Sequence, residues 1–98
     1  MTFNESNLDI VLRSIEESIN FYGEEISKPQ NWDFKLDLKI QDIINKSPNE
    51  AEKIRYTIKT LQMIGYIEFG NSDYSIISHI TPSGLKFLFS RLHNINFI

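Results

Sequence analysis

Residues 47–92 decide the fold, and their sequence is SPNEAEKIRYTIKTLQMIGYIEFGNSDYSIISHITPSGLKFLFSRL. Two short segments within this stretch mark places where the backbone has to turn, residues 64–68 (IGYIE) and residues 80–85 (ITPSGL). Apolar residues at helical spacing precede the first segment, strand-forming residues separate the two, and a second helical pattern follows. The stretch therefore predicts a helix, two short strands and a closing helix.

Local signals specify the first of these helices, over about residues 48–64. Ser47 supplies a cap, Pro48 occupies the first helical position, and Glu50 is spaced to close a capping box. The predicted core face consists of Ile54, Ile58 and Leu61. The predicted outward face and its flanks consist of Glu52, Lys53, Arg55, Tyr56, Lys59, Thr60 and Met63.

A hairpin and a closing helix follow. Gly65 is placed to end the preceding helix, and the predicted strands are residues 66–69 and 74–80, joined by a turn at residues 70–73. Thr81 and Pro82 repeat the combination of a hydroxyl and a proline, which predicts a helix start. The apolar stripe of that helix consists of Leu85, Leu88, Phe89 and Leu92.

The N-terminal segment predicts another amphipathic helix. Ser6 and Asp9 have the spacing of a capping box, so the helix is expected to start near Asn7, and Gly23 is placed to end it. Its apolar stripe consists of Leu8, Val11, Leu12, Ile15, Ile19 and Tyr22.

Residues 34–40 fit two structures. Apolar and charged residues alternate along FKLDLKI, which is typical of a strand, yet Leu36, Ile40, Ile43 and Ile44 also fit one helical face. We interpret residues 32–34 as a brief extended piece and residues 37–45 as a helix. The strand interpretation of residues 34–40 stays open.

These elements predict an α+β, mainly α, single domain over residues 1–98 with a winged helix-turn-helix architecture. Its order is helix, short strand, helix, helix, two-stranded wing and closing helix. The 98 residues, 41% of them hydrophobic, suffice for one small core. Cysteine is absent, which excludes disulfides and thiolate metal sites. A cytoplasmic protein is expected, because no apolar stretch approaches a membrane span and the N-terminus lacks the pattern of a signal peptide.

The sequence lacks the motifs of common catalytic sites. His79 and His93 are the only imidazoles, and neither has the neighbouring ligands that a zinc site needs. Ser78 lies beside His79, but no Gly-x-Ser-x-Gly motif is present to form a nucleophile elbow. The four glycines stand singly, so no phosphate-binding glycine loop is present. We expect no catalysis, no cofactor and no metal.

The charge distribution bears on nucleic-acid binding. The net charge is −3, and the acidic excess lies in residues 1–46, whereas the helix after Ser47 is slightly basic and the wing adds no cation. The candidate DNA-binding residues on this helix are Lys53, Arg55, Tyr56, Lys59 and Thr60. One interpretation is a dimeric, DNA-binding transcriptional regulator whose reading helix spans residues 48–64. The alternative is a winged-helix module that binds another protein and does not bind DNA.

Several apolar residues fall outside the predicted helical stripes or lie at the chain end. Such residues predict contact with a second copy or with another protein. The candidates are Ile10, Phe21, Met63, Phe87, Phe97 and Ile98.

Four segments together resemble a known group of proteins. They are residues 8–12 (LDIVL), 50–61 (EAEKIRYTIKTL), 64–67 (IGYI) and 80–88 (ITPSGLKFL). In this order they resemble the small YjcQ-like winged-helix proteins of bacteria and their phages. The resemblance implies a winged-helix fold, a bacterial or phage-related origin and DNA binding, but it carries no biochemical activity with it. The acidic N-terminal half and the wing without cations depart from the usual DNA-binding winged helix.

Overall fold

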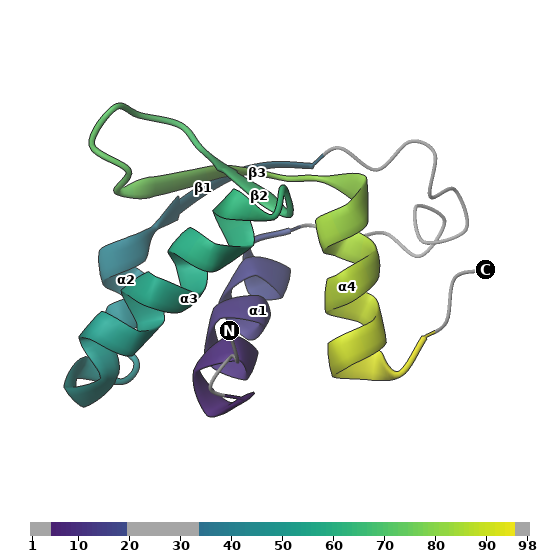
Figure 1. The fold of residues 1–98 in the computed structure, drawn as a ribbon, viewed down its shortest axis with the longest axis horizontal. Helices are drawn as coiled ribbons and strands as arrows, with labels where there is room; N and C mark the ends of the chain where they lie inside the picture. The colour runs from purple at the N-terminus through teal and green to yellow at the C-terminus, as the bar shows by residue number, and fades with distance from the viewer. Residues whose placement is uncertain (1–4, 20–33, 96–98) are drawn as a thin grey trace.

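The computed structural model describes residues 5–19 and 34–95 (Figure 1). The order of its elements is α1 (Glu5–Ser18), β1 (Phe34–Lys39), α2 (Ile40–Ile44), the 3-10 helix η3 (Pro48–Glu50), α3 (Ala51–Met63), β2 (Ile67–Phe69), β3 (Ile76–Ile80) and α4 (Pro82–His93). This order, with a β-hairpin between the third and the closing helix, is that of a winged helix. The predicted α+β, mainly helical fold class is confirmed.

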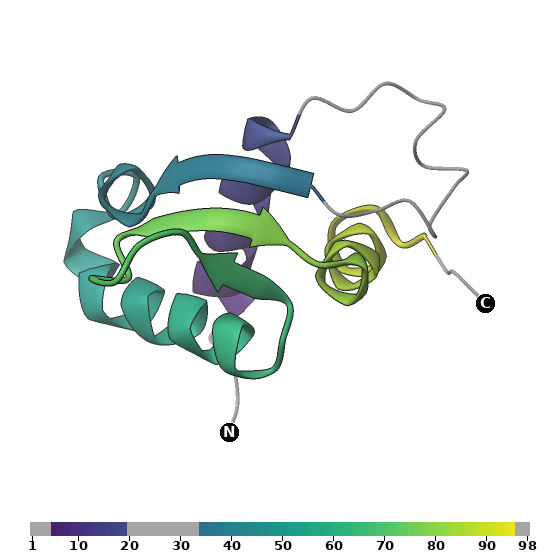
Figure 2. The same cartoon turned by 90° about the horizontal axis from the view of Figure 1, so that it is seen from above.

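The three strands form one antiparallel sheet in the order β1-β3-β2. Ile80 of the central strand is the register partner of Phe34 on one side and Ile67 on the other. The sheet lies across one side of the helices, and α1 passes behind it between α3 and α4 (Figures 1 and 2). The wing is the hairpin formed by the edge strand β2 and the central strand β3.

The core forms where α1 meets the sheet, α3 and α4. The predicted stripe of α1 is buried from Leu8 to Ile19, and the predicted stripes of α3 and α4 are buried except for Leu92, which is partly exposed. The predicted capping box of Ser6 and Asp9 is wrong, because α1 already includes Glu5 and Ser6 therefore lies inside the helix rather than at its cap. The predicted end at Gly23, and Tyr22 with it, lie outside the described residues.

The helix predicted over residues 37–45 is wrong for residues 37–39, which belong to a strand. β1 extends through Lys39, and α2 is a single short helix of five residues that starts at Ile40. Leu36 and Leu38 are both buried while Asp37 between them is exposed, which is the period of a strand. Pairing with β3 favours the strand over the helix, because the ladder provides hydrogen-bond partners for the backbone N–H and C=O groups of this segment.

The predicted capping box before the third helix is also wrong. Pro48 does occupy the first turn, but that turn is the 3-10 helix η3, in which the Glu50 amide donates to the Ser47 carbonyl at 3.0 Å. Neither the Ser47 nor the Glu50 side chain makes a capping hydrogen bond. The tighter 3-10 turn satisfies a backbone amide that the predicted box would have capped.

The connection between α3 and α4 is held by Thr81. Gly65 ends the α3 segment with φ +83°, a left-handed conformation that favours glycine. The Thr81 hydroxyl donates to the Gly65 carbonyl at 2.7 Å and accepts from the Gly84 amide at 3.2 Å, which confirms its predicted role as the cap of α4. Gly84 itself packs directly on the backbone of Tyr66. These contacts fix the wing relative to α3.

Candidate functional site

The solvent-facing side of α3 is the candidate site. Ile54, Ile58 and Leu61 are almost completely buried on the opposite side of this helix, as predicted. The outer face, a term used below for the exposed side of α3, consists of Glu52, Lys53, Arg55, Tyr56, Lys59 and Met63. The helical repeat brings these residues onto one side, and neither the sheet nor another described helix covers them.

Two cations of the outer face are available to a ligand. Arg55 and Lys59 are exposed, stand one turn apart, and form no ion pair with any side chain in residues 5–19 or 34–95. Lys53, by contrast, lies 3.3 Å from a Glu50 carboxylate oxygen. The exposed ring of Tyr56 follows Arg55 directly on the same face. The face therefore offers two unneutralised positive charges and an aromatic side chain.

Thr60 does not belong to the outer face. The sequence placed it outward, but only 9% of its surface is exposed, and its hydroxyl donates to the Tyr56 carbonyl at 2.9 Å. Thr57 is buried in the same way, with its hydroxyl on the Lys53 carbonyl at 2.8 Å. A hydroxyl that bonds back to its own helix can be buried without an unsatisfied donor. Thr60 is therefore removed from the surface available to a ligand.

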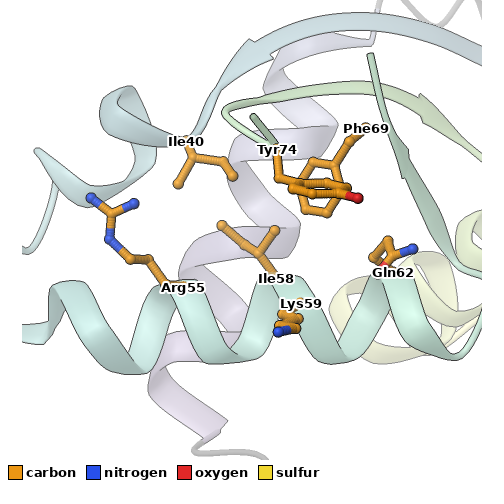
Figure 3. A pocket seen from close by; sticks show the side chains of 7 residues that line it. All are labelled: Ile40, Arg55, Ile58, Lys59, Gln62, Phe69 and Tyr74. Atoms are coloured by element: carbon orange, nitrogen blue, oxygen red, sulfur yellow. The ribbon is translucent and has the colours of Figure 1, made fainter. Parts of the chain in front are cut away.

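A pocket of about 380 Å³ opens between α3 and the wing (Figure 3). It is lined by Ile40, Arg55, Ile58, Lys59, Gln62, Phe69 and Tyr74. The α3 side chains lie on one side, and the rings of Phe69 and Tyr74 lie on the other. These two rings pack edge to face with centroids 5.4 Å apart, at opposite ends of the wing turn.

The wing turn is held by its own polar side chains. The Asn71 side-chain oxygen accepts from the amides of Ser75 and Ile76 at 3.1 and 3.2 Å, and the Asp73 carboxylate accepts from the Ser75 amide at 3.2 Å. Tyr74 adopts a left-handed backbone conformation, with φ 57°. The turn contains no lysine or arginine, so its fixed charge is the single carboxylate of Asp73.

The residues predicted to contact a second subunit or a partner are scattered. Met63 is 68% exposed on the outer face. Ile10 is half-buried against the core, and the Phe87 ring packs against the tilted ring of Tyr66 with centroids 5.1 Å apart, so both residues already have contacts within the chain. The remaining candidates, which lie outside the described residues, are Phe21, Phe97 and Ile98.

Reasoning from the sequence missed the pocket. It identified Arg55 and Lys59 from their place on a helix, but not Phe69 and Tyr74, which come from the wing, or Ile40, which comes from the start of α2. One signal was available, because Phe69 and Tyr74 flank the predicted turn and a hairpin brings such residues together. The third wall, which is Ile40, could not be found because its position depends on where α2 begins.

The side chains of Ser78, His79 and Glu68 form a small polar cluster on the sheet. The Ser78 hydroxyl lies 3.0 Å from Nδ1 of His79, and a Glu68 carboxylate oxygen lies 3.9 Å from that same nitrogen. In a hydrolytic triad the nucleophile and the orienting carboxylate contact different ring nitrogens. This cluster does not have that geometry.

Comparison with known proteins adds no relative to these observations. No family model, curated protein or solved structure matches the chain significantly. Within residues 5–19 and 34–95, no group of three His, Asp or Glu side chains is placed to hold a metal ion. No helix in the same residues is long and apolar enough to cross a bilayer.

Proposed function

We propose that this protein binds double-stranded DNA as a transcriptional regulator of bacterial or prophage origin, with α3 as the reading helix. The observation that carries the proposal is the pair Arg55 and Lys59, exposed without ion-pair partners among the described side chains on the outer face of a winged helix. The homodimer expected from the sequence is part of the proposal, since a second copy would double the number of cations.

The shape and chemistry of α3 suit the major groove. A helix of 13 residues is roughly 20 Å long at 1.5 Å per residue, and the groove is wide enough to admit one. An arginine can bond to a guanine edge with two parallel hydrogen bonds, and a lysine can neutralise a phosphate. Tyr56 adds a phenol that can donate a hydrogen bond to a phosphate.

The wing is expected to contribute little to phosphate binding. Its turn contains Asp73 and no cation, so its electrostatic effect on a phosphate is repulsive. The attraction must therefore come mainly from α3. Each of the two α3 cations is therefore expected to contribute a large share of the total electrostatic attraction to DNA.

We predict that the double substitution Arg55→Gln and Lys59→Gln weakens binding to a random-sequence duplex about tenfold or more at low salt, because two phosphate or base contacts are lost. Fluorescence anisotropy with a labelled duplex measures the affinity, and circular dichroism checks that the fold is retained. Lys86→Gln is the matched control, because this exposed lysine lies on α4, across α1 from α3 (Figure 1). Equal affinity in the double variant and the wild type would exclude α3 as the DNA-binding surface.

A second candidate function is supported by the exposed apolar residues. The large hydrophobic side chains that are exposed among the described residues are Tyr56, Met63, Ile64 and Tyr74, with exposed fractions of 49%, 68%, 50% and 64%. All four lie on α3, at its C-terminal end, or on the wing. Large apolar side chains that stay exposed on one part of a fold are typical of protein-binding surfaces. The alternative function is therefore a protein-interaction module, such as an accessory factor of a phage or mobile element.

The two functions are separated by one double variant. If the protein docks a partner, Met63→Ser with Ile64→Ser is expected to abolish retention of that partner from a bacterial lysate and to change the affinity for duplex DNA less than about twofold, since neither residue is charged. Quantitative affinity purification measures retention, and the Arg55→Gln, Lys59→Gln protein is the matched control. Retention that is unchanged by the serine substitutions would exclude this apolar surface as the docking site.

A further inference from the structure

We infer that the pocket between α3 and the wing binds a small aromatic anion, such as an aromatic carboxylate or sulfonate. The pocket has an apolar interior and a cationic rim, and its volume of about 380 Å³ lies within the range of small-molecule sites. This binding function is separate from DNA binding and is argued only from the residues that line the pocket.

The walls of the pocket are apolar and partly flat. Ile58 is a buried side chain on the α3 side of the pocket, and the buried Ile40 and the Phe69 ring lie opposite it (Figure 3). The Tyr74 ring completes the wall beside Phe69 and remains 64% exposed, so one aromatic ring is open to a ligand. Aromatic rings gain by stacking on or edging against another ring, and apolar walls favour a ligand with an apolar body.

The rim of the pocket selects for negative charge. Arg55 and Lys59 contribute two cations, and Gln62 adds an amide that can donate hydrogen bonds. None of the described residues that line the pocket has a carboxylate. An adjoining hollow, which shares Arg55 and Tyr74, includes Lys39 as well as Asp73. The charge around the ligand therefore remains positive, and an anion would neutralise it.

The backbone at Tyr74 supports a binding role for its ring. A tyrosine in the left-handed region of backbone conformation costs free energy that a glycine at the same position would avoid. Backbone strain of this kind is concentrated at functional positions. The hydrogen bonds of Asn71 and Asp73 hold the turn in this conformation. The result is a ring fixed against Phe69 at the mouth of the pocket.

Occupation of the pocket would also affect DNA binding. Arg55 and Lys59 belong both to the rim of the pocket and to the outer face of α3, so an anion held between them would occupy the charges that attract phosphate. A ligand of this class would then act as an inducer that releases DNA. This consequence, unlike the binding itself, rests on the proposed function.

The test uses two fluorescent probes with the same pair of ring systems. One is 8-anilinonaphthalene-1-sulfonate, and the other is N-phenyl-1-naphthylamine, which lacks the sulfonate. We expect one sulfonate probe to bind per chain with a dissociation constant on the order of tens of micromolar, and the neutral probe to bind about tenfold more weakly. Amide chemical shifts of the full chain should change at Ile58, Gln62 and Tyr74.

Variants then separate the charged rim from the apolar wall. Arg55→Gln with Lys59→Gln should weaken the sulfonate probe about tenfold and leave the neutral probe unchanged, because only the charge contact is lost. Tyr74→Gly should weaken both probes, because it removes the exposed ring while relieving the backbone strain. Lys86→Gln and Lys35→Gln, at exposed lysines outside the pocket, are the controls and should change neither probe. Circular dichroism confirms that each variant is folded.

Two results would overturn the inference. One is equal affinity for the two probes in the wild type, and the other is a set of shifted amides in α1 or α4 rather than around the pocket. Because the titrations contain no DNA, they fail or succeed independently of the proposed function. Added sulfonate probe that displaces a labelled duplex from the wild type would support the inducer role, whereas simultaneous binding of probe and duplex would exclude it.

Discussion

At the scale of single residues, Gly84 lies directly against the backbone of Tyr66. A Cβ atom at this position would lie 2.1 Å from the Tyr66 carbonyl oxygen and 2.8 Å from its carbon, and backbone atoms cannot move aside without shifting the hairpin or α4. We expect Gly84→Ala to lower the free energy of unfolding by about 3 kcal/mol, at the upper end of overpacking effects. Urea unfolding followed by circular dichroism measures the change.

Gly65 provides the matched control for this prediction. A Cβ atom there would have no neighbour within 4 Å, but the residue has φ +83°. Gly65→Ala should therefore cost only about 1 kcal/mol, which is the backbone penalty of a left-handed alanine. If the two alanine variants lost equal stability, the close approach at Gly84 would not be the cause of its effect.

At the scale of elements, short sequence signals correctly predicted the turns and helix ends that depend on only a few neighbouring residues. Pro48, Gly65 and the Thr81–Pro82 pair identified the turns around α3, the wing and the start of α4, and all of these elements are present. Their physical reasons act within a few residues, through a fixed φ, a left-handed turn or a capping hydroxyl. The capping box at Glu50 was predicted by the same logic but lost to a 3-10 turn.

The segment around β1 could not be predicted in this way. Its apolar residues fit a strand and a helix equally well, and pairing of Phe34 with Ile80 decides the outcome across 46 residues of sequence. The same limit applies to the pocket, whose walls come from α2, α3 and the wing. The sequence predicted which side of α3 faces solvent at most positions, but it could not show what lies opposite that side, and it placed the buried Thr60 outward.

The strand assignment leads to a testable pattern of stability. Leu36 and Leu38 each keep only 9% of their surface exposed, whereas Asp37 is exposed. We expect Leu36→Ala and Leu38→Ala each to cost about 2–3 kcal/mol of unfolding free energy and Asp37→Ala to cost less than about 0.5 kcal/mol. Two residues so spaced lie on opposite sides of a helix, so a helix could not bury both. A large effect at only one leucine, measured by urea unfolding, would contradict the strand.

At the scale of the whole molecule, three acidic side chains of α1 contact basic side chains of other elements. A carboxylate oxygen of Asp9 lies 3.1 Å from Nε of Arg91, and one of Glu16 lies 2.6 Å from Nε2 of His93. A carboxylate oxygen of Glu17 lies 2.9 Å from Nζ of Lys46. Such exposed contacts contribute little to stability one by one. Their consequence for binding is larger, because they neutralise basic groups outside α3, whereas Arg55 and Lys59 on the outer face form no ion pair with a described side chain.

This distribution of charge predicts an unusually weak salt dependence for DNA binding. With two or three phosphates neutralised per chain, the slope of log affinity against log salt concentration should be about −1.8 to −2.7, which is roughly a 10- to 40-fold loss between 50 and 200 mM salt. A dimer that places both α3 helices on DNA should double the slope. Anisotropy titrations across a salt series, with the oligomeric state measured by sedimentation, give the slope per chain.

A slope of zero would leave no phosphate contact for α3 to make, and the exposed apolar surface around Met63 would then define a protein-docking function. A slope per chain far steeper than −3 would instead require cations beyond Arg55 and Lys59, and would move the DNA-binding surface away from the outer face of α3.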